Sequence, residues 1–174
     1  DPDLELASAI LEYIEDNGEV NAPELCAFQK TRTRITAYDY NDEAESLDLF
    51  YLIKADTLLG KINKSKIEQG FNYLKSFYRE SMNNTLLKSI DVSSNDEIVE
   101  VAKLVQSTKG QINQLRLYVI TDGLTESDAA GAAVESDDGE YIIEFNVWDM
   151  QRVYQQHNIR AGKEKVEIDF PTEY

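Results

Sequence analysis

The chain has 174 residues, which is enough for one domain with a sizeable hydrophobic core. It carries 33 acidic and 17 basic residues, and this net charge of -16 disfavours nonspecific binding to nucleic acid or anionic lipid. The single cysteine, Cys26, excludes an intrachain disulfide, and no apolar run approaches the roughly 20 residues of a transmembrane helix. We therefore expect one domain over residues 1–174, located in the cytoplasm and not in a membrane.

The first predicted element is a helix over residues 3–17. Apolar side chains recur there at the spacing of one helical face: Leu4, Ala7, Ile10, Leu11 and Ile14. Asn17 and Gly18 follow as a stop signal. We expect this face to pack on the core.

The pattern then changes to that of strands. Residues 24–30, 32–40 and 47–53 predict three strands rich in β-branched and aromatic side chains. The acidic stretch 41–46 between the second and third is typical of a turn. The three strands predict an antiparallel meander whose central feature is a long hairpin.

Two helices are predicted next. The first covers residues 64–83, with apolar side chains at helical spacing. The second follows a capping box, in which the Ser94 side chain accepts from the third amide of the helix and Glu97 reaches back. These helices follow the meander directly, so we expect them to cover the sheet.

The remaining residues predict two more strands and a short helix. Residues 115–120 form an apolar run with few charges, which is typical of a buried strand. Residues 124–139 are small, polar and acidic, and Asp138-Gly139 signals a turn before the strand 141–148. Asp149 can cap a helix through Tyr154, and residues 166–170 are a candidate last strand. The order predicts an α/β (α+β) fold with one mixed sheet flanked by helices.

Few residue groups carry obvious chemistry. His157 is the only histidine, which excludes histidine metal clusters, and no glycine-rich phosphate loop is present. The predicted order of a helix, a meander and a second helix is, however, also the order found at the start of a restriction-endonuclease-like core. That core takes an Asp from one strand and Glu/Gln-x-Lys from the next, so that two ligands hold Mg²⁺ and the lysine steadies developing charge.

The hairpin keeps only part of that motif. Lys54 supplies the lysine, but Thr36 and Leu52 occupy the positions of the metal ligands. Asp39 and Asp48 are the nearby carboxylates that substitute for them in a rearranged site, and Asp48 shares the strand parity of Lys54. Mg²⁺ is expected only if such a site exists.

The segment Trp148-Asp149-x-x-Arg152, together with shorter motifs along nearly the whole chain, resembles part of the N-terminal domain of the AIPR (abortive infection phage resistance) proteins. This segment is the most specific of the motifs. The others are more diffuse: Glu24–Phe28, Ile35–Glu43, Leu47–Phe50, Leu115–Gly123, Asp138-Gly139 and Ile168–Phe170.

This resemblance implies a bacterial origin, a role in antiviral defence, and a chain that is the N-terminal domain of a longer protein. Thr36 and Ala37 depart from the family's Asp-Gly, which places an inherited nuclease role in question. Trp148 and Arg152 are candidate binding residues. The alternative for this segment is a strand-to-helix corner in which Trp148 packs, Asp149 caps and Arg152 lies one turn on.

Three functions follow from these observations. The first is a noncatalytic recognition or assembly module of a phage-defence protein, whose partner is the rest of that protein or a phage or host protein. The second is a metal-dependent nuclease that uses Asp39, Asp48 and Lys54. The third, suggested by charge alone, is a DNA mimic.

Overall fold

The computed structural model describes residues 1–89, 96–126, 131–137 and 141–159. An unlabelled helix covers residues 150–159. The labelled elements are, in chain order, α1 (Pro2–Asp16), β1 (Glu24–Gln29), β2 (Arg34–Asn41), β3 (Ser46–Ile53), β4 (Lys61–Ile62), α2 (Lys64–Met82), α3 (Thr85–Ser89), α4 (Asp96–Ser107), β5 (Gln114–Thr121), β6 (Leu124–Thr125), β7 (Gly131–Asp137) and β8 (Tyr141–Trp148).

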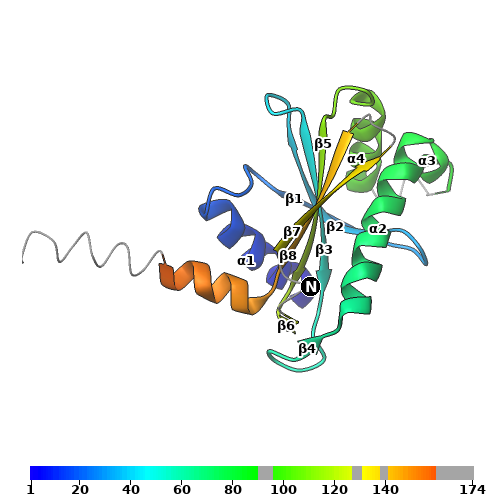
Figure 1. Cartoon of the computed structure of the whole chain (residues 1–174). Coiled ribbons are helices and arrows are strands. Elements are labelled where there is room, and N and C mark those ends of the chain that lie inside the picture. Colours follow the sequence, from blue (N-terminus) through cyan, green and yellow to red (C-terminus); the bar gives the residue numbers. More distant parts are fainter. Residues whose placement is uncertain (90–95, 127–130, 138–140, 160–174) are drawn as a thin grey trace, which may run out of the picture.

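A six-stranded mixed sheet forms the centre of the described structure, with the order β1-β2-β3-β5-β8-β7. The meander β1-β2-β3 is antiparallel, β3, β5 and β8 run parallel, and β7 returns antiparallel to β8. A small parallel pair, β4 and β6, lies at the carboxyl end of the parallel strands (Figure 1). The hairpin β2-β3 therefore leads directly into the buried centre of the sheet.

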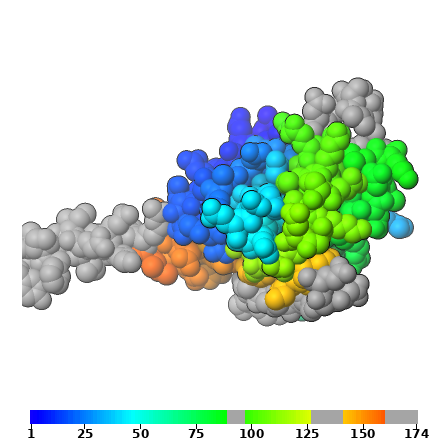
Figure 2. Space-filling model, turned by 90° about the horizontal axis from the view of Figure 1, so that it is seen from above, coloured from blue at the N-terminus to red at the C-terminus, as the bar shows by residue number. Residues whose placement is uncertain are grey.

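Helices cover both faces of this sheet. α2, α3 and α4 lie on one face, and α1 with the helix 150–159 lies on the other (Figure 1). From above, the blue N-terminal segment and the green helical layer flank the cyan turn of the hairpin (Figure 2). Side chains of β3 point alternately to the two faces of the sheet. Leu47 and Leu49 pack in the core on the α2 side, and Phe50 packs in the core on the α1 side.

Most of the predicted elements are confirmed. α1 buries Ala7, Ile10, Leu11 and Ile14, as the periodicity predicted, and the three meander strands, α2, β5 and β8 lie within a few residues of their expected bounds. The mixed sheet with a long hairpin is also confirmed. In the described residues, no helix is both long enough and apolar enough to span a bilayer.

Three strands, β4, β6 and β7, were not predicted from the sequence. The residues of β7 instead predicted a polar connection. The start of the capping box at Ser94, the Asp138-Gly139 turn and the candidate strand 166–170 lie outside the described residues.

Cys26 is a buried core residue on β1. Its side chain is completely enclosed within the α2-side core. Burial, with Glu97 and Glu24 as further contributors, raises the pKa of the thiol far above its usual range. Because the thiolate is the reactive form, Cys26 is expected to be inert in the folded protein.

Candidate functional site

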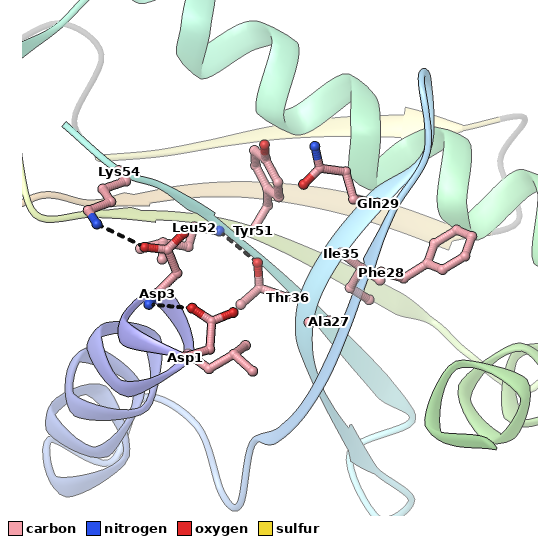
Figure 3. Close-up of a pocket in the computed structure, with 11 residues that line it drawn as sticks. Asp1, Asp3, Ala27, Phe28, Gln29, Ile35, Thr36, Tyr51, Leu52 and Lys54 are labelled. Carbon is pink, nitrogen blue, oxygen red and sulfur yellow. Dashed lines mark hydrogen bonds and ion pairs between the residues drawn. The ribbon is translucent and has the colours of Figure 1, made fainter. Parts of the chain in front are cut away.

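A pocket opens where the hairpin ends, between the first turn of α1 and the outer strand β1. We call it the hairpin pocket. Its volume is about 370 Å³, and its lining residues are Asp1, Asp3, Leu4, Ala27, Phe28, Gln29, Ile35, Thr36, Tyr51, Leu52 and Lys54. The three hairpin positions singled out from sequence, Thr36, Leu52 and Lys54, thus border one cavity (Figure 3).

The polar groups of this pocket are largely occupied with one another. Lys54 Nζ lies 3.0 Å from Asp3 Oδ1, and both side chains are about half exposed. Thr36 Oγ1 accepts a hydrogen bond of 3.0 Å from the Leu52 amide, and Asp1 Oδ1 accepts from the Asp3 amide (Figure 3). The hydroxyl at the first motif position therefore joins the two hairpin strands.

These side chains do not fit a Mg²⁺ site of the expected kind. Mg²⁺ binds through one or more carboxylates held in near-octahedral geometry. Leu52 offers no ligand atom, and Asp3 already pairs with Lys54. Across the described ranges, no group of three or more His, Cys, Asp or Glu side chains lies close enough to hold a metal ion.

The two other candidate carboxylates belong to a separate cluster at the opposite end of β3. Asp39 on β2 stands opposite Asp48 on β3, Asp48 opposite Arg116 on β5, and Arg116 opposite Glu144 on β8. We call these four residues the ionic row. It crosses four strands on the α1 side of the sheet.

Arg116 and Asp48 form the centre of the ionic row. The guanidinium donates through Nε and Nη2 to the two Asp48 oxygens at 2.7 and 2.6 Å. The Asp48 side chain is only 3% exposed. Burial raises the pKa of Asp48 to about 6, although the guanidinium opposes this rise. Burial lowers the pKa of Arg116. The hydrogen bonds and charge of Asp48 together have a larger effect, so the pKa of Arg116 is raised.

The other carboxylates of the row are also satisfied. Asp39 is buried and accepts from the amides of Asn21 and Ala22, and so fixes the loop that follows α1. Glu144 accepts from the side-chain amides of Gln114 and Asn146. Each carboxylate of the row therefore has a structural partner.

The structure thus brings Asp39 and Asp48 together but leaves Lys54 elsewhere. Asp48 and Lys54 do share the α1 side, as the strand parity predicted. Lys54 lies six positions along the chain from Asp48, just past the end of β3, which corresponds to ~20 Å of extended strand. The three residues of the rearranged nuclease hypothesis do not line one cleft.

The segment Trp148-Asp149-x-x-Arg152 forms a corner between β8 and the helix 150–159. Trp148 is buried, and the Arg152 guanidinium lies 3.9 Å from the centre of its ring while donating to the Val147 carbonyl. Asp149 accepts from the Arg152 amide as a helix cap, and from the amide and hydroxyl of Thr125. Trp148 thus packs in the α1-side core and Asp149 caps the helix, while the Arg152 guanidinium lies over the Trp148 ring.

Comparison with known proteins gives one match. The family described as the abortive infection phage resistance protein N-terminal domain matches residues 6–155. The chain belongs to this family. The match begins within α1 and ends within the helix 150–159, so it covers the sheet and the corner, and the hairpin pocket except for Asp1, Asp3 and Leu4. No curated protein and no solved structure matches the chain.

Membership of the AIPR N-terminal family does not by itself assign the fold to a known class. The restriction-endonuclease-like core therefore stays a prediction. The residue that sequence reasoning missed is Arg116. A signal was present, because Arg116 and Asp48 are each the single charge within an apolar strand, and such charges are seldom buried without a partner.

Proposed function

We propose that this AIPR N-terminal domain is a noncatalytic recognition or assembly module of a bacterial phage-resistance protein, acting in the cytoplasm. The observation that carries this proposal is the hairpin pocket. Thr36 and Leu52 stand at its ligand positions, and Asp3 neutralises Lys54. Because the described residues hold no cluster of metal ligands, we infer that the domain contributes to defence by binding.

The partner is the remainder of the longer protein, or a phage or host protein. Nucleic acid is disfavoured as a partner, because the net charge of -16 repels phosphates. A protein partner has no such barrier and can use the carboxylates on the surface for pairing.

A second function is supported by one observation in the same pocket. Lys54 lies there beside the carboxylates of Asp3 and Asp1, so a cation and two acidic groups border one cavity. The alternative is a metal-dependent nuclease, but its site differs from the one expected from the sequence, because Asp39 and Asp48 lie away from Lys54 and Asp3 has to release Lys54 to bind a metal. The two functions differ in whether nucleic acid is cleaved.

The recognition role is tested by identifying a partner. Residues 1–174 carrying an affinity tag are expressed in bacteria that also produce the remainder of the longer protein, with and without phage infection, and the cross-linked complexes are analysed by mass spectrometry. We expect a protein enriched over a tag-only control, and saturable binding when that protein is purified and mixed with the domain. The proposal fails if nothing is enriched in either condition.

A further inference from the structure

The outer edge of the sheet at β1 is open. β1 pairs with β2 on one side, and no strand in the described ranges pairs with its other side. In an antiparallel edge strand, alternate residues point their N–H and C=O groups away from the neighbouring strand. Such groups form hydrogen bonds with an extended peptide that joins the sheet as an added strand.

Two pockets lie along this edge, both between α1 and β1. One is the hairpin pocket, beside Ala27, Phe28 and Gln29. The second has a volume of about 430 Å³ and is lined by Ser8, Leu11, Glu12, Glu15, Asp16, Pro23 and Leu25, and we call it the acidic pocket. Leu25 borders the acidic pocket and the second half of β1 borders the hairpin pocket, and the register of β1 shifts between Leu25 and Phe28.

The helical wall of these pockets is uniformly acidic. Residues 1–29 contain eight acidic side chains and no lysine, arginine or histidine. Asp1 and Asp3 face the hairpin pocket, where Asp3 pairs with Lys54, while Glu12, Glu15 and Asp16 line the acidic pocket and are exposed. Lysine on an edge strand is one device that discourages pairing, and β1 has no lysine.

We propose that the groove between α1 and β1 binds an extended, basic peptide segment of a partner protein. The peptide joins the sheet at β1 through backbone hydrogen bonds, and its alternate side chains enter the two pockets. Its lysines and arginines pair with the carboxylates of α1. This inference deepens the proposed recognition role and rests on it.

The same charges argue against the other occupants of such an edge. A nucleic-acid strand would bring phosphates against Glu12, Glu15 and Asp16. A second copy of this chain would place two acidic α1 helices on one joined sheet, each from a protein of charge -16. A basic peptide is attracted by the wall that repels both.

The test uses a fluorescein-labelled seven-residue peptide of alternating lysine and valine, with a glutamate–valine peptide as its counterpart. Fluorescence anisotropy should show saturable binding of the lysine peptide and none of the glutamate peptide. Hydrogen exchange of the complex should show added protection of β1 amides, because the peptide occupies the open edge. Binding without protection of residues 24–29 would overturn the proposal, since charge attraction alone gives that result.

Three variants locate the binding. Ala27→Lys places a cation in the hairpin pocket, and Glu12→Lys/Glu15→Lys reverses the wall of the acidic pocket. Each is expected to weaken binding roughly tenfold, because attraction at the groove becomes repulsion. Glu43→Lys/Glu68→Lys makes the same charge change as the double variant on exposed residues outside the groove, and is expected to stay within about twofold of wild type. Equal losses in both double variants would overturn the proposal.

The natural partner separates this inference from the recognition role. A partner that is captured by the wild type but not by Ala27→Lys supports both the recognition role and the β1 groove as its binding site. A partner that binds Ala27→Lys equally well leaves the recognition role standing and removes the β1 groove. If no partner is captured at all, the recognition role itself fails.

Discussion

Replacing Arg116 with methionine is expected to lower the free energy of unfolding by about 3–5 kcal/mol, because it leaves the Asp48 carboxylate buried and unpaired. Few single substitutions cost this much in a protein whose total stability is about 5–15 kcal/mol. Urea denaturation followed by circular dichroism measures the change. The companion variant Asp48→Asn/Arg116→Met should recover much of the loss, since it removes both charges.

The loss in Arg116→Met should also depend on pH. The folded-state pKa of Asp48 lies above its unfolded value of 3.8, and removing the guanidinium raises it further. The folded state then holds a proton that the unfolded state releases, so stability rises as the pH falls through the folded pKa. The variant should therefore lose less stability at pH 5 than at pH 8. Lys54→Met, which breaks the exposed pair with Asp3, should cost no more than about 1 kcal/mol at either pH.

Asp149→Ala is expected to destabilise the domain by about 3 kcal/mol. The carboxylate is buried and accepts from the amide of Arg152 and from the amide and hydroxyl of Thr125. Its loss removes a helix cap, worth about 1 kcal/mol, and leaves the Thr125 donors without a partner, at about 1–3 kcal/mol. Chemical denaturation of the variant and of wild type gives the difference.

Two further variants bracket this expectation. Asp149→Asn keeps one acceptor oxygen and should fall between wild type and Asp149→Ala. Asp56→Ala removes an exposed carboxylate and should change stability by less than about 0.5 kcal/mol. If Asp149→Ala costs no more than Asp56→Ala, Asp149 does not hold the corner together.

Local patterns in the sequence were enough to predict much of the fold. The apolar spacing in α1 and the continuous apolar run of β5 report directly on burial, because each reflects the face that meets the core. β7 escaped prediction since its sequence, Gly131–Asp137, is small and acidic. The strand conformation of β7 depends on its pairing with β8, and the residue types in β7 do not indicate that pairing.

The candidate site was only partly predictable for a related reason. The pairing of Thr36 with Leu52 follows from hairpin register, so the sequence reading placed both at one end of the hairpin. Asp3 meets Lys54, and Arg116 meets Asp48, across 51 and 68 positions of sequence. Such contacts are set by how α1 and β5 pack on the hairpin, which no local pattern encodes.

We propose that this AIPR N-terminal domain recognises a partner and does not cleave nucleic acid. The most direct measurement incubates the purified domain with single- and double-stranded DNA and with RNA, in Mg²⁺ and in Mn²⁺, beside Lys54→Ala. We expect no cleavage by the wild type, or a trace that is identical in Lys54→Ala and so arises from a contaminant. Metal-dependent cleavage by the wild type that disappears in Lys54→Ala would contradict the claim.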